Sequence, residues 1–498
     1  MENKFYITTT LPYVNSDPHL GFALELVQAD IIARYHREVL KQDVFFNTGT
    51  DEHGQKVYAK AVQSGKDTQA YVDEYADKFK QLMPALGILP DIHFIRTTDA
   101  HHIKAAQEFW RLCEAKGDIY KKIYKVKYCV GCELEKTESD LDENGRCKVH
   151  PHLEIEFIEE ENYFFRFSRY EQKLLEFYAQ YPDFVVPGFR FNEIKQFVKN
   201  GLQDFSISRL KSKMPWGVPV PEDDSHVMYV WFDALINYVS TLGWPEASNQ
   251  LISKSANQFA DFWGTLEKSN AIQIAGKDNL RQQSAMWQAM LMSAGLPNSK
   301  QIIIHGFINS SGQKMSKSLG NVADPYEILS KLESKGLTKE QAADALRYYL
   351  AREISTFEDG DYTWEKFVES YNAGLANGIG NLTSRILKMA VSAGILPISP
   401  ITSYQSNQLL DHYELQKAAD AIWQQIKACD EFIQKNEPFK VIKTNKEKAE
   451  KDIKYLLSEL HQIAAELIPL LPHTSEQILK ILKDPKLENI PRLFPRIE

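Results

Sequence analysis

Three cysteines and one histidine are spaced along the chain as the ligands of a tetrahedral metal ion are. The pattern runs Cys129-x2-Cys132-x14-Cys147-x2-His150. Two short ligand pairs separated by a spacer of hairpin length are typical of zinc sites built from thiolates and imidazoles. Because these protein ligands would fill the coordination shell, we predict one structural Zn²⁺ per chain. His152 is an alternative to His150 as the fourth ligand.

A second group of residues has the chemistry of a phosphate site. Residues 18–22, Pro-His-Leu-Gly-Phe, stand where a strand-like segment passes into a helical pattern. The first N–H groups of a helix and its dipole attract anions. His19 could donate to a phosphate oxygen, and Gly21 lets a ligand approach the backbone closely. By itself this pattern also occurs by chance at helix starts.

A short loop further along the chain combines two lysines with two hydroxyl groups. Its sequence is Lys314-Met315-Ser316-Lys317-Ser318. Such a loop would suit closure over a polyphosphate, but an isolated basic loop is more often a solvated turn. Its meaning therefore depends on the elements around it.

The surrounding pattern predicts an α/β domain followed by helices. Residues 5–10 and 44–46 are aromatic and β-branched, as in buried strands, and residues 19–40 carry apolar side chains at helical spacing. A strand–helix–strand unit implies a parallel sheet with ligands at the carboxyl ends of its strands. From about Thr363 onward helix follows helix, which predicts a bundle. Thr474 opens a capping-box pattern in that region.

Composition narrows the class of protein. Hydrophobic residues make up 43% and charged residues 25% of the 498 residues, and no stretch approaches the roughly 18 apolar residues that span a bilayer. The first residues show no signal or transit peptide, so a cytoplasmic protein without membrane contact is expected. An odd number of cysteines, five, does not suit a disulfide framework. The net charge of −9 argues only weakly against nucleic-acid binding, which needs a local basic surface.

The loop at residues 314–318 matches in full the KMSKS signature of the class I aminoacyl-tRNA synthetases, and residues 18–22 resemble their HIGH signature. Within that class, the chain resembles the methionyl-tRNA synthetases over nearly its whole length. The other matching segments are residues 11–15, 49–54, 229–234, 275–278, 345–350, 359–361 and 381–385. The resemblance implies an α/β Rossmann-type catalytic domain with a zinc-knuckle insertion, followed by an all-α anticodon-binding helical bundle.

Five regions follow from the resemblance together with the patterns. They are the first half of the catalytic Rossmann domain (1–116), the connective insertion with the zinc knuckle (117–222), the second Rossmann half (223–300), the signature-loop and stem-contact region (301–362), and the anticodon-binding bundle (363–498).

The activity that the resemblance implies is that of a methionine–tRNA ligase. Such an enzyme joins L-methionine to the α-phosphate of ATP, releases pyrophosphate, and transfers methionine from the adenylate to the 3′ end of tRNA(Met), including the initiator. The reaction needs positioning of two anions and stabilisation of charge on the leaving pyrophosphate. Mg²⁺ is expected with ATP, and a monomer is expected.

The resemblance also implies which residues form each site. The catalytic residues are His19, Lys314 and Lys317. The ATP site comprises His19, Gly21, Lys277, Lys314, Ser316, Lys317 and Ser318. The methionine site comprises Leu11, Tyr13, Asp51, Trp231, Tyr238 and Gln283. The anticodon site comprises Asn381, Arg385, Pro438 and Phe439. Asp51 would hold the α-ammonium, and aromatic walls suit a polarisable thioether.

Four positions depart from the family pattern. Phe22 replaces the second histidine of HIGH, and Gln283 replaces a histidine of the methionine pocket. Leu235 replaces a common proline, and Phe439 replaces the tryptophan that usually binds the anticodon.

Two alternatives stay open on the residues alone. One is a class I synthetase for cysteine, leucine or isoleucine. The large editing insertions of the leucine and isoleucine enzymes are absent from the sequence, and a cysteine enzyme would place its zinc ligands in the catalytic cleft. The other is a non-catalytic relative that binds tRNA through its bundle, which Phe22 favours and the intact signature loop opposes. The lysines between Lys440 and Lys454 could contact the tRNA backbone, but a solvated helix face explains them better.

Overall fold

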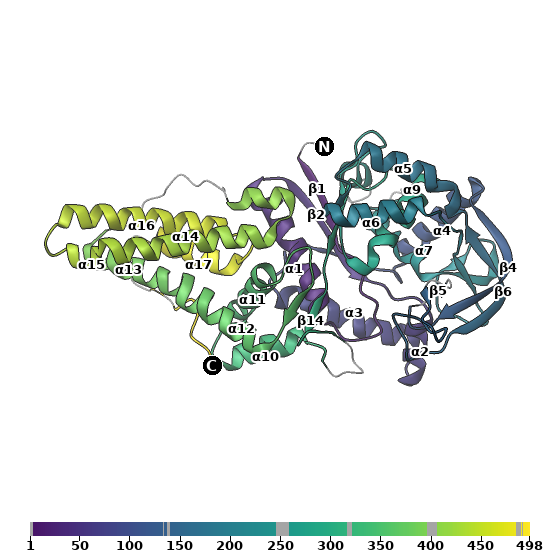
Figure 1. Ribbon diagram of the computed structural model, residues 1–498, viewed down its shortest axis with the longest axis horizontal. Helices are drawn as coiled ribbons and strands as arrows, with labels where there is room; N and C mark the ends of the chain where they lie inside the picture. The colour runs from purple at the N-terminus through teal and green to yellow at the C-terminus, as the bar shows by residue number, and fades with distance from the viewer. Residues whose placement is uncertain are drawn as a thin grey trace.

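The computed structural model describes residues 3–132, 134–136, 140–245, 258–315, 321–395, 406–484, 490 and 492–498, a few side chains among them aside. An α/β body lies at one end of an elongated molecule, and a bundle of long helices extends from it (Figure 1). Within these residues, no helix has the length and apolar character needed to cross a membrane.

A six-stranded parallel sheet forms the centre of the α/β body. Across the sheet the strands are β3 (His93–Arg96), β2 (Asp43–Thr50), β1 (Lys4–Thr8), β12 (Ala271–Gly276), β13 (Gln301–His305) and β7 (Val185–Val186). From β1 the chain continues outward to β2 and β3, and from β12 it continues to β13 on the other side, beyond which the earlier strand β7 forms the edge. The carboxyl ends of the neighbouring strands β1 and β12 therefore form a topological switch point, where open α/β sheets bind ligands.

Helix α1 (Leu20–Arg34) connects β1 to β2 and is buried on nearly all sides. Its apolar composition explains this placement, because a helix that is hydrophobic all round is stable only when enclosed. Its polar residues Glu25, Gln28 and Asp30 are buried too. A buried charge is costly unless it is paired, and Asp30 pairs with Arg34 and Arg347, each at 2.7 Å.

A second sheet carries the cysteine cluster. It is antiparallel and contains β5 (Leu134–Lys136), β4 (Ile119–Cys129), β6 (Glu156–Phe165) and β8 (Phe205–Ser206) in that order. Helices α5 (Glu171–Gln180) and α6 (Gly188–Lys199) follow, with β7 between them. Since β7 pairs in parallel with β13, the stretch between residues 117 and 222 also supplies the edge strand of the central sheet. A small sheet of β9 (Ser208–Leu210), β10 (Pro219–Val220) and β11 (Asp223–Met228) then leads into α7 (Val230–Ala234) and α8 (Asn237–Ser240).

Further α-helices of the body are α2 (Gln55–Gln63), α3 (Thr68–Ala85), α4 (Ala100–Ala115), α9 (Trp287–Ala294), α10 (Pro325–Ser334), α11 (Lys339–Tyr348) and α12 (Trp364–Ser370). A third sheet joins β15 (Gln313–Lys314), β14 (Ile308–Ser310) and β16 (Gly360–Tyr362). Its β14–β15 pairing forms the base of the signature loop.

The bundle consists of α13 (Asn381–Ala393), α14 (Leu415–Asn436), α16 (Lys446–Glu466) and α17 (Pro472–Lys483), with the short α15 (Pro438–Val441) at its free end (Figure 1). The capping-box prediction for Thr474 is wrong. Helix α17 begins at Pro472, and proline is favoured in the first turn. The Thr474 amide and hydroxyl both donate to Asp344 Oδ2 at 2.6 Å, so a tertiary contact uses the groups expected to cap the helix.

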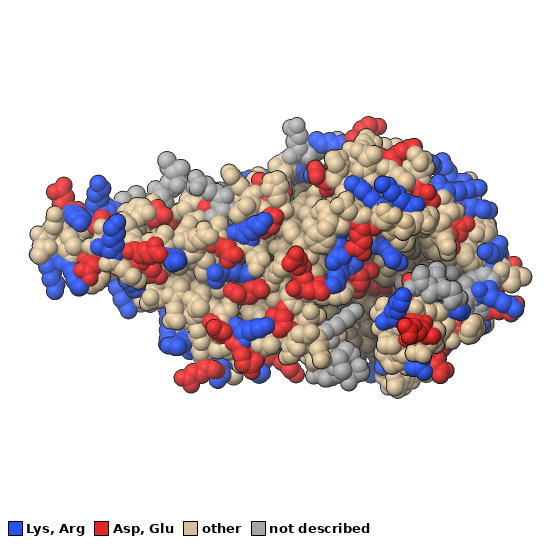
Figure 2. Space-filling view, in the orientation of Figure 1, with Lys and Arg blue, Asp and Glu red and all other residues tan. Residues whose placement is uncertain are grey.

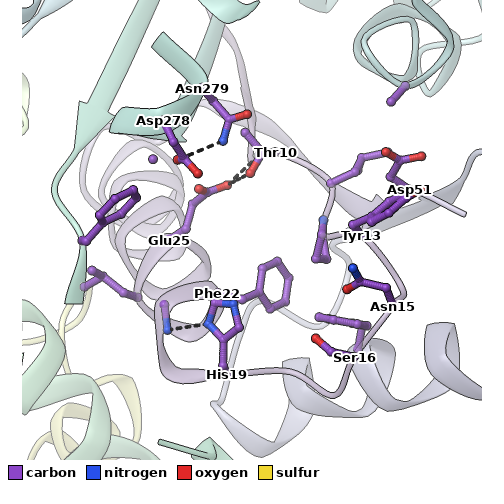
Figure 3. A pocket seen from close by; sticks show the side chains of 18 of the residues that line it. Thr10, Tyr13, Asn15, Ser16, His19, Phe22, Glu25, Asp51, Asp278 and Asn279 are labelled. Atoms are coloured by element: carbon purple, nitrogen blue, oxygen red, sulfur yellow. Dashed lines mark hydrogen bonds between the residues drawn. The ribbon is translucent and has the colours of Figure 1, made fainter. Parts of the chain in front are cut away.

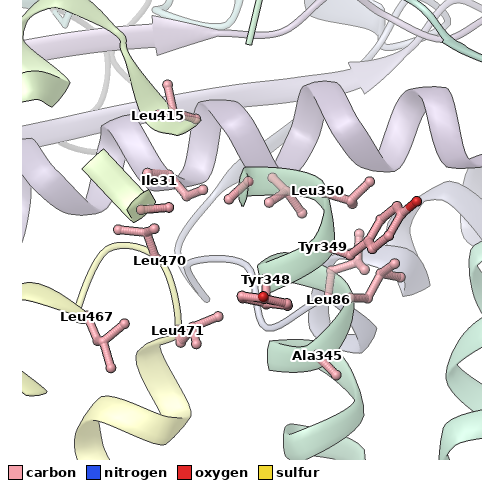
Figure 4. Close-up of a cluster of buried hydrophobic side chains, with 14 of the residues drawn as sticks. Ile31, Leu86, Ala345, Tyr348, Tyr349, Leu350, Leu415, Leu467, Leu470 and Leu471 are labelled. Carbon is pink, nitrogen blue, oxygen red and sulfur yellow. The ribbon is translucent and has the colours of Figure 1, made fainter. Parts of the chain in front are cut away.

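The bundle joins the body through a buried apolar cluster (Figure 4). Ile31 of α1, Leu350, and Leu470 from the connection between α16 and α17 all belong to this cluster. Within this cluster the fully buried Arg347 donates from Nε and Nη2 to the carbonyls of Leu470 and Pro469, each at 2.9 Å. The α/β domain, the inserted sheet and the helical bundle together confirm the predicted fold class.

Candidate active site and metal centre

A cavity of about 710 Å³ opens at the carboxyl edge of the central sheet. This volume lies in the usual range for small-ligand sites. Its walls come from the segments that follow β1, β2, β12 and β13, together with α1 and α7 (Figure 3). Eight of the residues predicted for the ATP and methionine sites line it: Leu11, Tyr13, His19, Gly21, Asp51, Trp231, Tyr238 and Gln283.

His19 is the N-cap of α1, and its Nδ1 atom accepts the Gly21 N–H at 3.1 Å (Figure 3). An accepting Nδ1 carries no proton, so the proton of the neutral ring lies on Nε2, which is a donor. One helix N–H that was expected to face a phosphate is thus used inside the protein. A Cβ atom at Gly21 would lie 2.9 Å from the His19 ring, so glycine permits this arrangement.

The signature loop begins at the cavity. Met315 lines the cavity, and its sulfur accepts the Ala323 N–H at 3.4 Å. The backbone of Lys314 pairs with Asn309 of β14. The predicted residues Ser316, Lys317 and Ser318 and the side chain of Lys314 lie outside the described residues.

Lys277 follows β12, and its neighbours Gly276 and Asp278 line the cavity. Lys277 is not among the described lining residues. Its ammonium group instead donates to both oxygens of Asp359, at 2.7 and 2.6 Å, and lies 4.6 Å from the centre of the Phe307 ring. In this arrangement the lysine charge is matched by a carboxylate beside the cavity.

Asp51 follows β2 and is tied through its backbone to the loop after β1. Its N–H donates to the Pro12 carbonyl at 3.0 Å, and its carbonyl accepts the Val14 N–H at 3.1 Å. These bonds hold Tyr13 beside Asp51. Gly54 has a φ of 108°, and a Cβ there would lie 2.3 Å from the Tyr13 hydroxyl, so the close packing requires glycine.

The deep end of the cavity is a chain of buried hydrogen bonds. The Gln283 amide donates to the Tyr238 hydroxyl at 2.7 Å, and its oxygen accepts from Gln273 at 3.0 Å. Burial raises the pKa of Tyr238, so its hydroxyl stays protonated at neutral pH. Neutral partners of fixed geometry therefore close this end of the cavity.

A polar network that the sequence patterns did not predict also lines the cavity. Glu25 accepts the amide and hydroxyl of Thr10, each at 2.6 Å, and pairs with His305 at 2.9 Å. Burial lowers the pKa of His305, but the hydrogen bond and charge of Glu25 outweigh it, and the pKa is raised overall. All three residues line the cavity. The signal available in the sequence was the charged Glu25 within the largely apolar helix α1.

The predicted metal ligands meet in space. One ligand atom from each of Cys129, Cys132, Cys147 and His150 lies within 4.8 Å of the others. The Cys132 and Cys147 sulfurs are 3.5 Å apart, and His150 Nδ1 lies 3.2 and 3.8 Å from the sulfurs of Cys132 and Cys129. With metal–sulfur distances of about 2.3 Å, a tetrahedral ion separates its ligand atoms by roughly 3.5–3.8 Å, and the separations of 3.2, 3.5 and 3.8 Å come close to this geometry.

The knuckle also touches the cavity. Cys132 lines it, and the Lys56 ammonium donates to the Gly131 carbonyl at 2.5 Å. Proximity of metal ligands to the cleft therefore does not separate this protein from a cysteine enzyme. The two remaining cysteines, Cys113 and Cys429, are buried free thiols.

The four residues predicted for the anticodon site lie in the bundle. Asn381 and Arg385 are one turn apart on α13, and Arg385 pairs with Asp430 of α14 at 2.5 Å. Pro438 is buried, whereas the Phe439 side chain is 46% exposed on α15. An exposed aromatic ring at the free end of a bundle is available to a partner.

Comparisons with known proteins decide the family. Residues 5–150 and 131–387 match the model of the class I tRNA synthetases of the methionyl group, and residues 399–492 match that of the anticodon-binding domain of methionyl tRNA ligase. The methionine–tRNA ligase of Thermotoga maritima is 41% identical, over 96% of this chain and 75% of its own length. That of Thermosynechococcus vestitus is 40% identical, over 96% and 90%.

The chain belongs to the methionyl-tRNA synthetases.

A solved structure of the same family agrees. The methionyl-tRNA synthetase of Mycobacterium tuberculosis in complex with methionyl-adenylate has a TM-score of 0.84 and 35% identity, covering 96% of this chain and 94% of its own. Family membership disfavours the synthetases for cysteine, leucine and isoleucine. Phe22, where the family pattern has a histidine, lines the cavity and packs edge-on against Phe79 at 5.2 Å.

Proposed function

We propose that the cavity joins L-methionine to ATP, giving methionyl-adenylate and pyrophosphate, and then transfers methionine to the 3′ end of tRNA(Met), the initiator included. The observation that carries this proposal is that His19, after β1, and Asp51, after β2, line one cavity at the carboxyl edge of the central sheet. A donor at one wall and a carboxylate at another suit a substrate that is anionic at one end and cationic at the other.

The methionine end would be built around Asp51, whose carboxylate would take the α-ammonium. Its support is position: Asp51 lies at the carboxyl end of a parallel strand and is held to the loop that carries Leu11 and Tyr13. Trp231 and Tyr238 would flank the thioether, and Gln283 would close the end of the pocket through its bond to Tyr238. Aromatic walls favour a polarisable sulfur.

The nucleotide end would use His19 and Gly21 for close contact with the phosphates and base, as the Nε2 donor supports. Lys277 would contribute after exchanging Asp359 for a phosphate. The signature-loop residues assigned to ATP are Lys314, Ser316, Lys317 and Ser318. Preorganised donors at the leaving pyrophosphate lower the barrier without acid–base chemistry. Mg²⁺ bound with ATP would neutralise phosphate charge.

The cluster at Cys129, Cys132, Cys147 and His150 would hold one structural Zn²⁺, since thiolates and imidazole favour this ion and four ligands leave no open position. Gly131 supports the assignment, because a Cβ there would lie 2.5 Å from the His150 ring.

The bundle would bind the CAU anticodon of tRNA(Met) through Asn381, Arg385, Pro438 and Phe439. Amide and guanidinium groups recognise base edges, and an exposed ring can stack on a splayed base. The division into regions 1–116, 117–222, 223–300, 301–362 and 363–498, a monomeric state and a cytoplasmic location belong to the same proposal.

ATP–pyrophosphate exchange with a panel of amino acids tests the assignment. Methionine should drive exchange far better than leucine, isoleucine or cysteine, and methionine should then appear on tRNA(Met). Methionine-independent exchange, or exchange driven best by another amino acid, would overturn the substrate. Absence of any exchange alongside tight tRNA binding would instead favour a non-catalytic tRNA-binding protein.

A further inference from the structure

A buried carboxylate bridges two histidines behind the methionine end of the cavity. Asp233 is fully buried, and its oxygens lie 2.7 Å from His53 Nδ1 and 2.9 Å from His102 Nε2. Both imidazoles are buried as well. None of the three residues belongs to the proposed ATP, methionine or metal sites.

The triad joins the two elements that carry the methionine-binding residues. His53 lies two residues after Asp51, and Asp233 lies two residues after Trp231 on α7. The hydrogen bond between His53 and Asp233 spans 180 positions of sequence. It therefore sets the distance between the loop that carries the proposed ammonium-binding carboxylate and the helix that carries the aromatic wall.

His102 extends the link to the deep end of the cavity. It lies on α4, and its second nitrogen, Nδ1, bonds to the Ser240 hydroxyl of α8 at 2.9 Å. Ser240 lies two residues after Tyr238, which binds Gln283. Both ring nitrogens of His102 and both oxygens of Asp233 are thus engaged, which a buried charged group requires.

The loop around His53 is held on its other side too. Glu52 forms a bidentate pair with Arg96, at 2.6 and 2.8 Å, and the Glu52 carbonyl accepts from the Trp216 indole at 2.7 Å. The short segment from Asp51 to Gly54 is therefore held on one side by the contacts of Glu52 and on the other by the hydrogen bond between His53 and Asp233.

We infer that Asp233, with His53 and His102, is a positioning residue for methionine, holding Asp51 and Trp231 at the separation that the amino-acid substrate requires. The inference rests on the proposed function. A displacement of about 1 Å at a positioning residue costs up to roughly a hundredfold in rate. In the described part of the chain, the triad's hydrogen bonds reach α4, α7, α8 and the Asp51 loop and none reaches α1, which carries the nucleotide end. Its loss should therefore act on methionine and spare ATP.

Asp233→Asn keeps the side-chain size and removes the charge that both imidazoles share. In ATP–pyrophosphate exchange we expect the methionine KM to rise about ten- to a hundredfold, with the ATP KM nearly unchanged. His53→Ala should act in the same direction. His53→Asn should recover most of the loss, because an Asn amide can place a donor near the position of Nδ1.

The matched control is His226→Gln. His226 is a buried histidine that pairs with Asp223 at 3.0 Å within strand β11, and it does not line the cavity. A merely structural His–Asp pair predicts a lower Tm and unchanged KM values, and we expect this result for His226→Gln. Methionine titration followed by tryptophan fluorescence, without ATP, measures the same binding step and remains usable where exchange is slow.

Equal increases in the KM for methionine and ATP, or a lower Tm with an unchanged methionine KM in Asp233→Asn and His53→Ala, would overturn the inference. If Asp233→Asn does not fold, comparing the methionine KM of His53→Ala with that of His53→Asn tests the inference. Failure of wild-type protein to show methionine-dependent exchange would count against the proposed function itself.

Discussion

The cavity at the carboxyl edge of the central sheet and the free end of the bundle are built in opposite ways. Around the cavity, residues from distant segments are held by buried contacts such as His53–Asp233 and Glu25–His305. At the free end of the bundle, Phe439 is exposed and follows directly from Pro438 at the start of a short helix. A cavity residue therefore depends on partners far away in the sequence, whereas a residue at the free end depends mainly on its own helix. Substitutions in the two regions should separate amino-acid activation from tRNA recognition.

The largest expected effect is at the signature loop. Lys317→Ala removes the proposed donor to the leaving pyrophosphate, and should slow adenylate formation about 10²–10³-fold in single-turnover measurements. The KM for tRNA and the affinity for methionine should change little. Lys335→Ala, at an exposed lysine that caps α10, is the control. Near-normal activation by Lys317→Ala would remove the lysine from the catalytic residues.

At the free end of the bundle we expect the opposite result, in which tRNA recognition is weakened and amino-acid activation is kept. Phe439→Ala should raise the tRNA KM about ten- to a hundredfold, because one stacked base contributes about 1–3 kcal/mol. Methionine-dependent ATP–pyrophosphate exchange should remain unchanged, and Phe439→Trp should retain aminoacylation. Val391→Ala removes another exposed apolar side chain of the bundle and should leave the tRNA KM as it is. A parallel loss of both reactions with a lowered Tm would mean that Phe439 packs the helix end.

The metal knuckle is a third region, and removing its metal tests whether activity in the cavity depends on the knuckle. Purified protein should contain one zinc per chain by elemental analysis, and Cys147→Ser should release it. Because Cys132 lines the cavity and Lys56 binds the Gly131 carbonyl, metal loss should also lower methionine activation, by less than Lys317→Ala does. Stoichiometric metal in Cys147→Ser would contradict the ligand set, and unchanged activation after metal loss would make the knuckle independent of the cavity.

The smallest effect concerns pH. The folded-state pKa of His305 is raised, so its pairing with Glu25 stabilises the protein below the ordinary histidine pKa of 6.5, and this stabilisation is lost as pH rises through the raised value. The Tm difference between wild type and His305→Gln should therefore be largest near pH 6 and shrink toward pH 9, by about 2 °C. A Tm difference that grows with pH would contradict a raised pKa of His305.

Local patterns were enough for much of the fold. The Cys-x-x-Cys and Cys-x-x-His pairs bring their ligands together within single turns, so their spacing alone predicted a metal site. The strands β1 and β2 and helix α1 were also predicted, because buried strands and enclosed helices are apolar throughout. The resemblance to the family supplied the positions of Asp51 and Trp231.

What only the tertiary structure decided lies in contacts between residues far apart in sequence. Glu25 and His305 are separated by 280 positions in the sequence, and Lys277 pairs with Asp359, which lies 82 positions away. Thr474 binds Asp344 instead of capping its own helix. A polar side chain's partner depends on which segments the fold places side by side, and sequence spacing reports only neighbours on one helix or strand. Sequence therefore determined the elements and the local metal motif, while the fold determined which buried charges meet around the cavity.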